Sequence, residues 1–125
     1  CVIERDAQWH LARVAFQGGH LWIRDSGAAV GTPVRLRVLA RDVSLTTQEP
    51  AHTSIQNHFQ AWIEADQPDA HPSQRVVRLR VGTKGANPAA GPVVLARITQ
   101  RAWSQLGLAG GQSVWVQVKS VALVG

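Results

Sequence analysis

The chain has 125 residues, of which 45% are hydrophobic, and its 13 Lys and Arg against 8 Asp and Glu leave a net charge of +5. This composition predicts a compact globular unit and excludes intrinsic disorder, and the charge permits a nucleic acid, an anionic surface or a small oxyanion as partner. The single cysteine excludes an internal disulfide framework and a cysteine-based zinc site, and no apolar run approaches the ~20 residues that span a bilayer. A reducing, cytoplasmic setting is expected, and the lack of methionine, even at residue 1, suggests a fragment or a processed product.

Alternation of apolar and polar residues dominates the chain and predicts mostly β structure. In the first block, strands are expected at residues 11–16 and 20–23, joined by a hairpin turn, and at residues 33–39 and 43–47. A polar loop at 25–31 separates the two pairs. Four strands are too few to close a barrel, so this block is expected to pack on, or pair with, the rest of the chain.

A second block opens near His52, with strands expected at residues 58–64, 75–81, 93–98, 113–118 and 121–124. An exposed turn is predicted at 66–73 and a mobile, linker-like stretch at 82–91. Residues 99–106 break the alternation and predict a short helix with Thr99 as N-cap and Gly107 just past its end. We therefore predict an N-terminal β lobe over residues 1–51 and an OB-like Greek-key barrel over residues 52–125, an all-β fold with one short helix.

Motifs for catalysis or metal binding were not found in the sequence. There is no Gly-rich phosphate-binding loop, no dinucleotide fingerprint and no Gly-x-Ser-x-Gly elbow, and the five histidines show no ligand spacing. We therefore expect no enzymatic activity and no metal site in this chain.

Five tryptophans stand out in a chain without tyrosine. Trp62 and Trp115 fall on the faces opposite the rows of valines, which favours a role at an interface between subunits. Stacking on the bases of a single-stranded nucleic acid is the alternative for an OB-like barrel that carries aromatics and arginines.

Donors for a small anion are concentrated in two segments that flank strands. Residues 53–57 (Thr-Ser-Ile-Gln-Asn) offer hydroxyls, an amide and a free backbone, and Lys119-Ser120 adds a charge and a further hydroxyl. Residues 52–60 and 117–125 contain no Asp or Glu, as a dianion site requires. The first and last strands of an OB barrel can be neighbours, so the two segments could converge. The competing interpretation is that Ser54 and Asn57 merely cap a turn.

Four motifs follow one another along the chain: Ala40-Arg41-Asp42-Val43-Ser44-Leu45, Thr53-Ser54-Ile55-Gln56-Asn57, Ala96-Arg97-Ile98-Thr99 with Leu106-Gly107-Leu108 and Gly110-Gly111, and Gln117-Val118-Lys119-Ser120-Val121. Together they resemble the C-terminal region of the ATP-binding subunit of molybdate ABC importers, which carries a TOBE/Mop-type oligomer-binding fold. The resemblance covers essentially the whole chain.

The resemblance implies an accessory domain without catalysis of its own, which forms a homodimer, binds intracellular molybdate or tungstate and regulates transport. In the intact importer it would lie at the inner face of the membrane, with the nucleotide-binding domain of the same chain, where ATP and Mg bind, and with a transmembrane permease subunit. Nucleic acid is not an expected partner. Carried over by motif, the oxyanion-binding residues are Ser54, Gln56, Asn57, Lys119 and Ser120, with Thr99 as a further candidate.

The sequence also departs from the family pattern. Stand-alone Mop proteins often have arginine where Gln56 stands and serine where Ala102 stands. A charge-assisted hydrogen bond contributes roughly 1.5–3 kcal/mol, so the loss of that arginine would weaken an anion site. Three alternatives therefore stay open: a structural dimerisation module without ligand, a molybdate storage or sensing Mop protein, and a single-strand nucleic-acid-binding OB domain.

Overall fold

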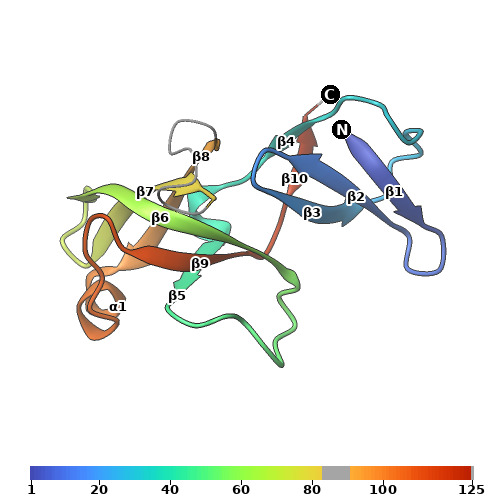
Figure 1. Cartoon of the computed structure of the whole chain (residues 1–125). Helices are drawn as coiled ribbons and strands as arrows, with labels where there is room; N and C mark the ends of the chain where they lie inside the picture. The colour runs from blue at the N-terminus through green and yellow to red at the C-terminus, as the bar shows by residue number, and fades with distance from the viewer. Residues whose placement is uncertain (83–90, 125) are drawn as a thin grey trace.

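The computed structural model describes residues 1–82 and 91–124, which form antiparallel strands and two short helices (Figure 1). The strands are β1 (Val2–Asp6), β2 (Leu11–Phe16), β3 (Gly19–Arg24), β4 (Arg35–Arg37), β5 (Val43–Thr46), β6 (Asn57–Pro68), β7 (Gln74–Val81), β8 (Val93–Thr99), β9 (Ser113–Val118) and β10 (Ala122–Val124). The helices are the 3₁₀ helix η1 (Ala40–Asp42) and the α-helix α1 (Gln100–Gln105). The predicted class, mostly strands with one short α-helix late in the chain, is confirmed.

The larger lobe is a curled five-stranded sheet in the order β5-β9-β6-β7-β8. Strand β8 also contacts β5 and η1, so the two ends of the sheet approach each other and form the OB-like half-barrel (Figure 1). Alternate residues of each strand point inward, and Ala61, Ile63, Leu79 and Val116 are completely buried. The valine rows predicted to face inward therefore form the core of this lobe.

The smaller lobe is a three-stranded sheet in the order β1-β2-β3. Its hairpin between β2 and β3 was predicted, and Gly18 turns the chain there with a positive φ of 99°. Strand β1 was not predicted, because its residues Val-Ile-Glu-Arg-Asp do not alternate. A bulge after Val2 breaks the register with β2, and Ile3 is 40% exposed as a result.

The two lobes exchange strands. Strand β4 of the first block pairs with β10 at the end of the chain, and β5 of the first block pairs with β9 of the second (Figure 1). The first block therefore pairs with the second, as expected for a block with too few strands of its own. The division between residues 51 and 52 stays a prediction, and strands on each side of it pair with strands on the other.

Several boundaries differ from the sequence prediction. The strand expected at 33–39 is limited to the three residues that pair with the short β10. Strand β6 continues to Pro68, into the predicted turn, because its last residues pair with the start of β7 and Asp66 forms a 2.6 Å ion pair with Arg75. The stretch expected to be mobile, at 82–91, lies almost entirely outside the described residues.

Helix α1 begins and ends where the sequence predicted. The backbone N–H of Ala102 donates to the hydroxyl of Thr99 at 3.0 Å, which makes Thr99 the N-cap. Gly107 follows the helix in a left-handed conformation, with φ of 63°. The guanidinium of Arg75 lies 5.1 Å from the ring centroid of Trp103 and holds the helix against β7.

Candidate functional site

A pocket of about 370 Å³ lies where the start of β6 and the end of β9 meet the hairpin of the smaller lobe. It is lined by Leu11, Trp22, Ser54, Ile55, Gln56, Asn57, Val118 and Lys119. The two donor segments singled out in the sequence therefore converge, because Asn57 and Val118 are direct partners in the ladder between β6 and β9. The pocket is the place in this chain where most of the predicted site residues come together.

The loop before β6 presents its polar side chains to solvent. His52 adopts a positive φ of 53°, and the Thr53 hydroxyl then accepts a hydrogen bond from the Ile55 backbone N–H at 3.1 Å. This turn leaves Ser54 and Gln56 exposed at the wall of the pocket. Their side chains can therefore meet a ligand without first breaking a hydrogen bond within the described part of the chain.

Asn57 is already engaged by the smaller lobe. Its side-chain carbonyl accepts from the backbone N–H of Trp22, and its amide nitrogen donates to the backbone carbonyl of Trp22, both at 2.8 Å. A side-chain amide has two donors, so one N–H remains for a ligand. The main role of this side chain in the structure is to join the first residue of β6 to the edge of β3.

Lys119 supplies the positive charge of the pocket. Its backbone N–H donates to the carbonyl of Asp42 at 2.9 Å, which ties the end of β9 to η1. The residue is exposed, and within the described residues its ammonium group forms no ion pair. The described lining carries no carboxylate. An anion in the pocket would therefore meet a cation that is not already neutralised.

The structure does not bring the other two predicted residues into this pocket. Ser120 is exposed and follows Lys119 directly, but it is not part of the lining. Thr99 lies beside α1, at the opposite end of the larger lobe, where its hydroxyl caps the helix (Figure 1). Within one copy of the chain, Thr99 and Lys119 therefore cannot contact the same small anion.

Leu11 and Trp22 line the pocket but were not predicted. Trp22 was recognised only as one of several tryptophans, and no motif marks either residue. The Arg13 guanidinium lies 5.7 Å from the ring centroid of Trp22, but it pairs with Glu4 at 3.7 Å and does not line the pocket. Sequence reasoning missed these residues because they enter the site through the packing of one lobe on the other.

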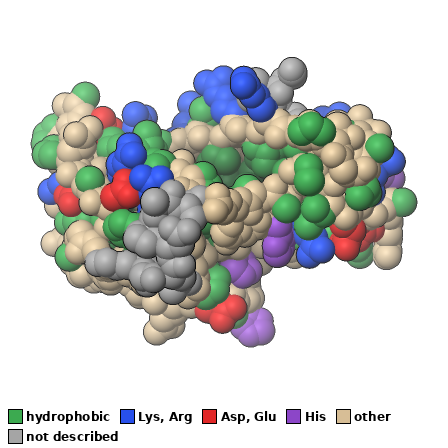
Figure 2. All heavy atoms as spheres, turned by 45° about the horizontal axis from the view of Figure 1, so that its top comes forward, with side chains coloured by type: hydrophobic (Ala, Val, Ile, Leu, Met, Phe, Trp, Pro, Cys, Tyr) green, Lys and Arg blue, Asp and Glu red, His purple; other side chains and the backbone are tan. Residues whose placement is uncertain are grey.

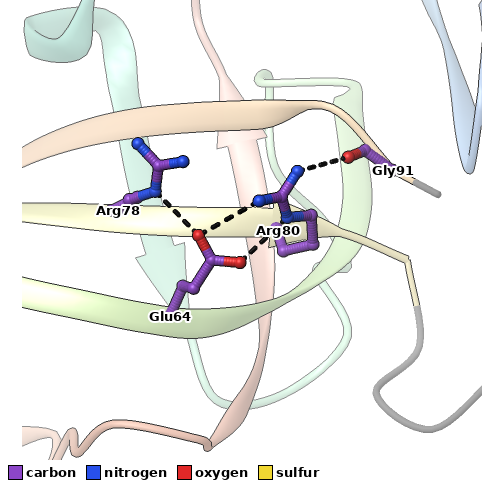
Figure 3. Close-up of polar contacts among 4 residues, drawn as sticks. All are labelled: Glu64, Arg78, Arg80 and Gly91. Atoms are coloured by element: carbon purple, nitrogen blue, oxygen red, sulfur yellow. Dashed lines mark hydrogen bonds and ion pairs between the residues drawn. The ribbon is translucent and has the colours of Figure 1, made fainter. Parts of the chain in front are cut away.

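A separate polar cluster lies on the outer face of the larger lobe (Figure 3). Glu64 accepts hydrogen bonds from Arg80 and Arg78, which hold the pKa of its carboxyl below the ordinary value. Arg80 also donates to the carbonyl of Gly91 at 3.0 Å. In the smaller lobe, a backbone hydrogen bond from Gly27, followed by the pairing with Arg5, lowers the pKa of Asp25. Arg78 and Arg80 are paired with Glu64, and Arg5 is paired with Asp25. We therefore interpret both groups of charged residues as structural.

Residues 1–82 and 91–124 contain no group of three His, Cys, Asp or Glu side chains arranged to hold a metal ion. None of the helices in this part of the chain is long and apolar enough to cross a membrane.

The curled five-stranded sheet with its short helix places the chain in the OB-like class of folds. Residues 53–124 match the TOBE domain family, and the chain belongs to this family. Its fold is similar to that of the cytoplasmic molybdate-binding protein ModG, with a TM-score of 0.73 at 23% identity over 90% of this chain and 82% of that one.

Similar sequences are molybdenum import ATP-binding proteins, which agrees with the resemblance seen in the motifs. The chain is 50% identical to ModC of Methylococcus capsulatus over 121 residues, which cover 97% of this chain and 32% of that protein. It is 44% identical to ModC of Thiobacillus denitrificans over 124 residues, or 99% of this chain and 32% of that protein. The chain thus spans about a third of the length of these relatives.

Proposed function

We propose that this chain is the accessory domain of the ATP-binding subunit of a molybdate importer, and that it binds intracellular molybdate or tungstate to regulate transport. The observation that carries the proposal is the convergence of the 53–57 loop with Lys119 in a pocket whose described lining carries no carboxylate. Among the described residues, the Lys119 ammonium forms no ion pair. Further support comes from ModG, which shares the fold and is a molybdate-binding protein.

The chemistry of the pocket suits a tetrahedral dianion. Lys119 provides a charged donor, the Ser54 hydroxyl and the Gln56 amide provide neutral donors, and Asn57 retains one N–H. These groups come from one copy of the chain and leave the anion open on its outer side. We propose that a second copy covers it, so that binding and dimerisation are coupled by linkage.

In the longer protein, the same domain would be joined to a nucleotide-binding domain that hydrolyses ATP and would lie against a permease at the inner face of the membrane. The names of the relatives support this arrangement. The accessory domain itself would supply no catalytic group, and its effect on transport would come from the equilibrium between paired and unpaired copies.

A structural dimerisation module without ligand is the second candidate. It is favoured by the two hydrogen bonds that engage Asn57 with Trp22 and by a neutral glutamine at position 56. Both features reduce the number of strong donors available to an anion.

Titration calorimetry with molybdate, with sulfate as the competing anion and light scattering in the same buffer, separates the two candidates. Lys119→Gln removes a charge-assisted hydrogen bond of about 1.5–3 kcal/mol, so it should weaken molybdate binding about 10- to 150-fold. Ser54→Ala should weaken it by a smaller factor. Arg101→Gln and Ser104→Ala on exposed positions of α1 are matched controls and should leave the affinity unchanged.

Saturable binding to a dimer, weakened about 10- to 150-fold by Lys119→Gln, supports the regulatory site. A dimer that takes up no molybdate in the unmodified protein removes the oxyanion proposal and leaves the structural module. Equal losses in Lys119→Gln and Arg101→Gln would mean that only net charge matters, and the pocket would then not be the site.

A further inference from the structure

A larger groove of about 750 Å³ lies on the other side of the lobe junction, and its lining is mostly apolar. Figure 2 shows hydrophobic side chains gathered in a hollow between the lobes, beside a group of basic side chains. One wall is β2 with its turn, from Val14 to Phe16, and the facing wall is the segment from Val34 to Ala40, which contains β4. The start of β8 closes one side.

Strand β4 is paired along only one edge. Its partner is β10, and no second strand lies beside residues 35–37 in the described part of the chain. In the larger lobe the corresponding strand, β9, is flanked on both edges, by β5 and by β6. An edge that is open over apolar side chains is a ready place for a further strand.

The two lobes repeat the same arrangement of strands in register. The backbone N–H of Val2 donates to the carbonyl of Thr32 at 3.0 Å, and that of Ile63 donates to the carbonyl of Gln112 at 2.9 Å. A β-bulge follows Val2 in β1, and a β-bulge follows Ile63 in β6. The pairs β10-β4 and β1-β2-β3 of the smaller lobe thus match β5-β9 and β6-β7-β8 of the larger one, with Val2 at the position of Ile63. The one pairing of the larger lobe without a counterpart is that between β6 and β9, since β1 and β4 are not paired in the described part of the chain.

This register shows what the groove would hold. Since Val2 corresponds to Ile63, Cys1 corresponds to Trp62, and β6 continues for five more residues back to Asn57. All five residues pair with β9, and Ala61 also pairs with Val81 at the end of β7. The equivalent positions in the smaller lobe lie directly before Cys1, between β2 and β4, and these are the two walls of the groove.

We propose that the groove is the seat of a β-strand formed by the five residues that directly precede Cys1 in the longer protein. The backbone of Cys1 already pairs with β2, because it donates to the carbonyl of Ala15 at 3.1 Å and accepts from the N–H of Ala15 at 2.9 Å. A residue before Cys1 that continued this pairing would enter the groove. Five extended residues span about 17 Å, and in the matching register they would lie along residues 34–38, which correspond to residues 114–118 of β9.

The same register assigns the side chains of this strand. The first and third residues before Cys1 take the places of Ala61 and Phe59, which are buried in the larger lobe. They should therefore be apolar and point into the groove, whereas the second and fourth face solvent. The proposal does not depend on oxyanion binding, because no residue that lines the pocket beside Lys119 also lines the groove.

Hydrogen exchange measured by mass spectrometry on the longer protein tests the proposal. The unmodified protein is compared with a variant in which the five residues before Cys1 are replaced by alternating glycine and serine. Amides of residues 34–39 should exchange at least tenfold faster in the variant. Amides of β9 should keep their protection in both proteins and serve as the internal control.

Equal exchange of residues 34–39 in the two proteins would overturn the proposal. Protection that rises with protein concentration would also overturn it, because a second copy would then be the occupant. If the glycine-serine variant does not fold, a variant with serine at only the first and third positions replaces it. Its expected result is the same acceleration at residues 34–39, by a smaller factor.

Discussion

Replacing Asn57 by alanine tests the link between the two lobes. The side chain makes two 2.8 Å hydrogen bonds to the backbone of Trp22, in a part-buried position. Each such bond stabilises a fold by ~0.5–1.5 kcal/mol net, and the loss leaves the N–H and carbonyl of Trp22 without this partner. We therefore expect Asn57→Ala to lower the free energy of unfolding by about 1–3 kcal/mol.

The assay is urea unfolding followed by tryptophan fluorescence, since Trp22 itself lies at the perturbed contact. Gln56→Ala is the control, because Gln56 is the exposed neighbour and should change stability by less than ~0.5 kcal/mol. Equal stability of the two variants would refute the reasoning and would mean that the bonds to Trp22 merely replace equally good bonds to water.

Three further predictions concern stability and can be measured by denaturant or thermal unfolding. Ile63→Ala should cost about 2–5 kcal/mol because Ile63 is completely buried, whereas Ile3→Ala, at a position 40% exposed, should cost much less; similar losses would contradict the assigned core. Thr99→Ala should cost about 1 kcal/mol through loss of the helix cap and leave molybdate titrations unchanged; a loss of affinity would instead assign Thr99 to a ligand site. The lowered pKa of Glu64 means that its ion pairs stabilise the fold above the ordinary carboxyl pKa and that this contribution is lost as pH falls through the lowered value. Glu64→Gln should therefore reduce stability at pH 7 and flatten the decline in urea midpoint toward pH 3, and an unchanged decline would exclude this carboxyl as a contributor.

The strands with regular alternation could be predicted because inward and outward positions are local properties of the sequence. The rows in β7 and β9, and the helix with its Thr99 cap, occur where the residues indicated. Strand β1 could not be predicted in this way, because charged residues fill most of its length and its bulge interrupts the period of two.

The candidate site was predicted in part. The sequence predicted that residues 53–57 and Lys119 could converge, because the first and last strands of an OB barrel can be neighbours. In the structure Asn57 pairs with Val118, and residues 54–57 and Lys119 line one pocket. It did not reveal that Asn57 is held by Trp22, nor that Thr99 lies at the far end of the lobe. These facts depend on how one lobe packs on the other.

The sequence alone therefore determined the position of most strands, which of their faces are apolar, and which loop carries donors for an anion. Only the tertiary structure decided that β4 and β5 leave their own block to pair with β10 and β9, and that the same pattern of strands occurs twice. The physical reason is that periodicity acts between residues two positions apart, whereas the choice of a partner strand depends on contacts between residues that are about 70 to 90 positions apart in this chain.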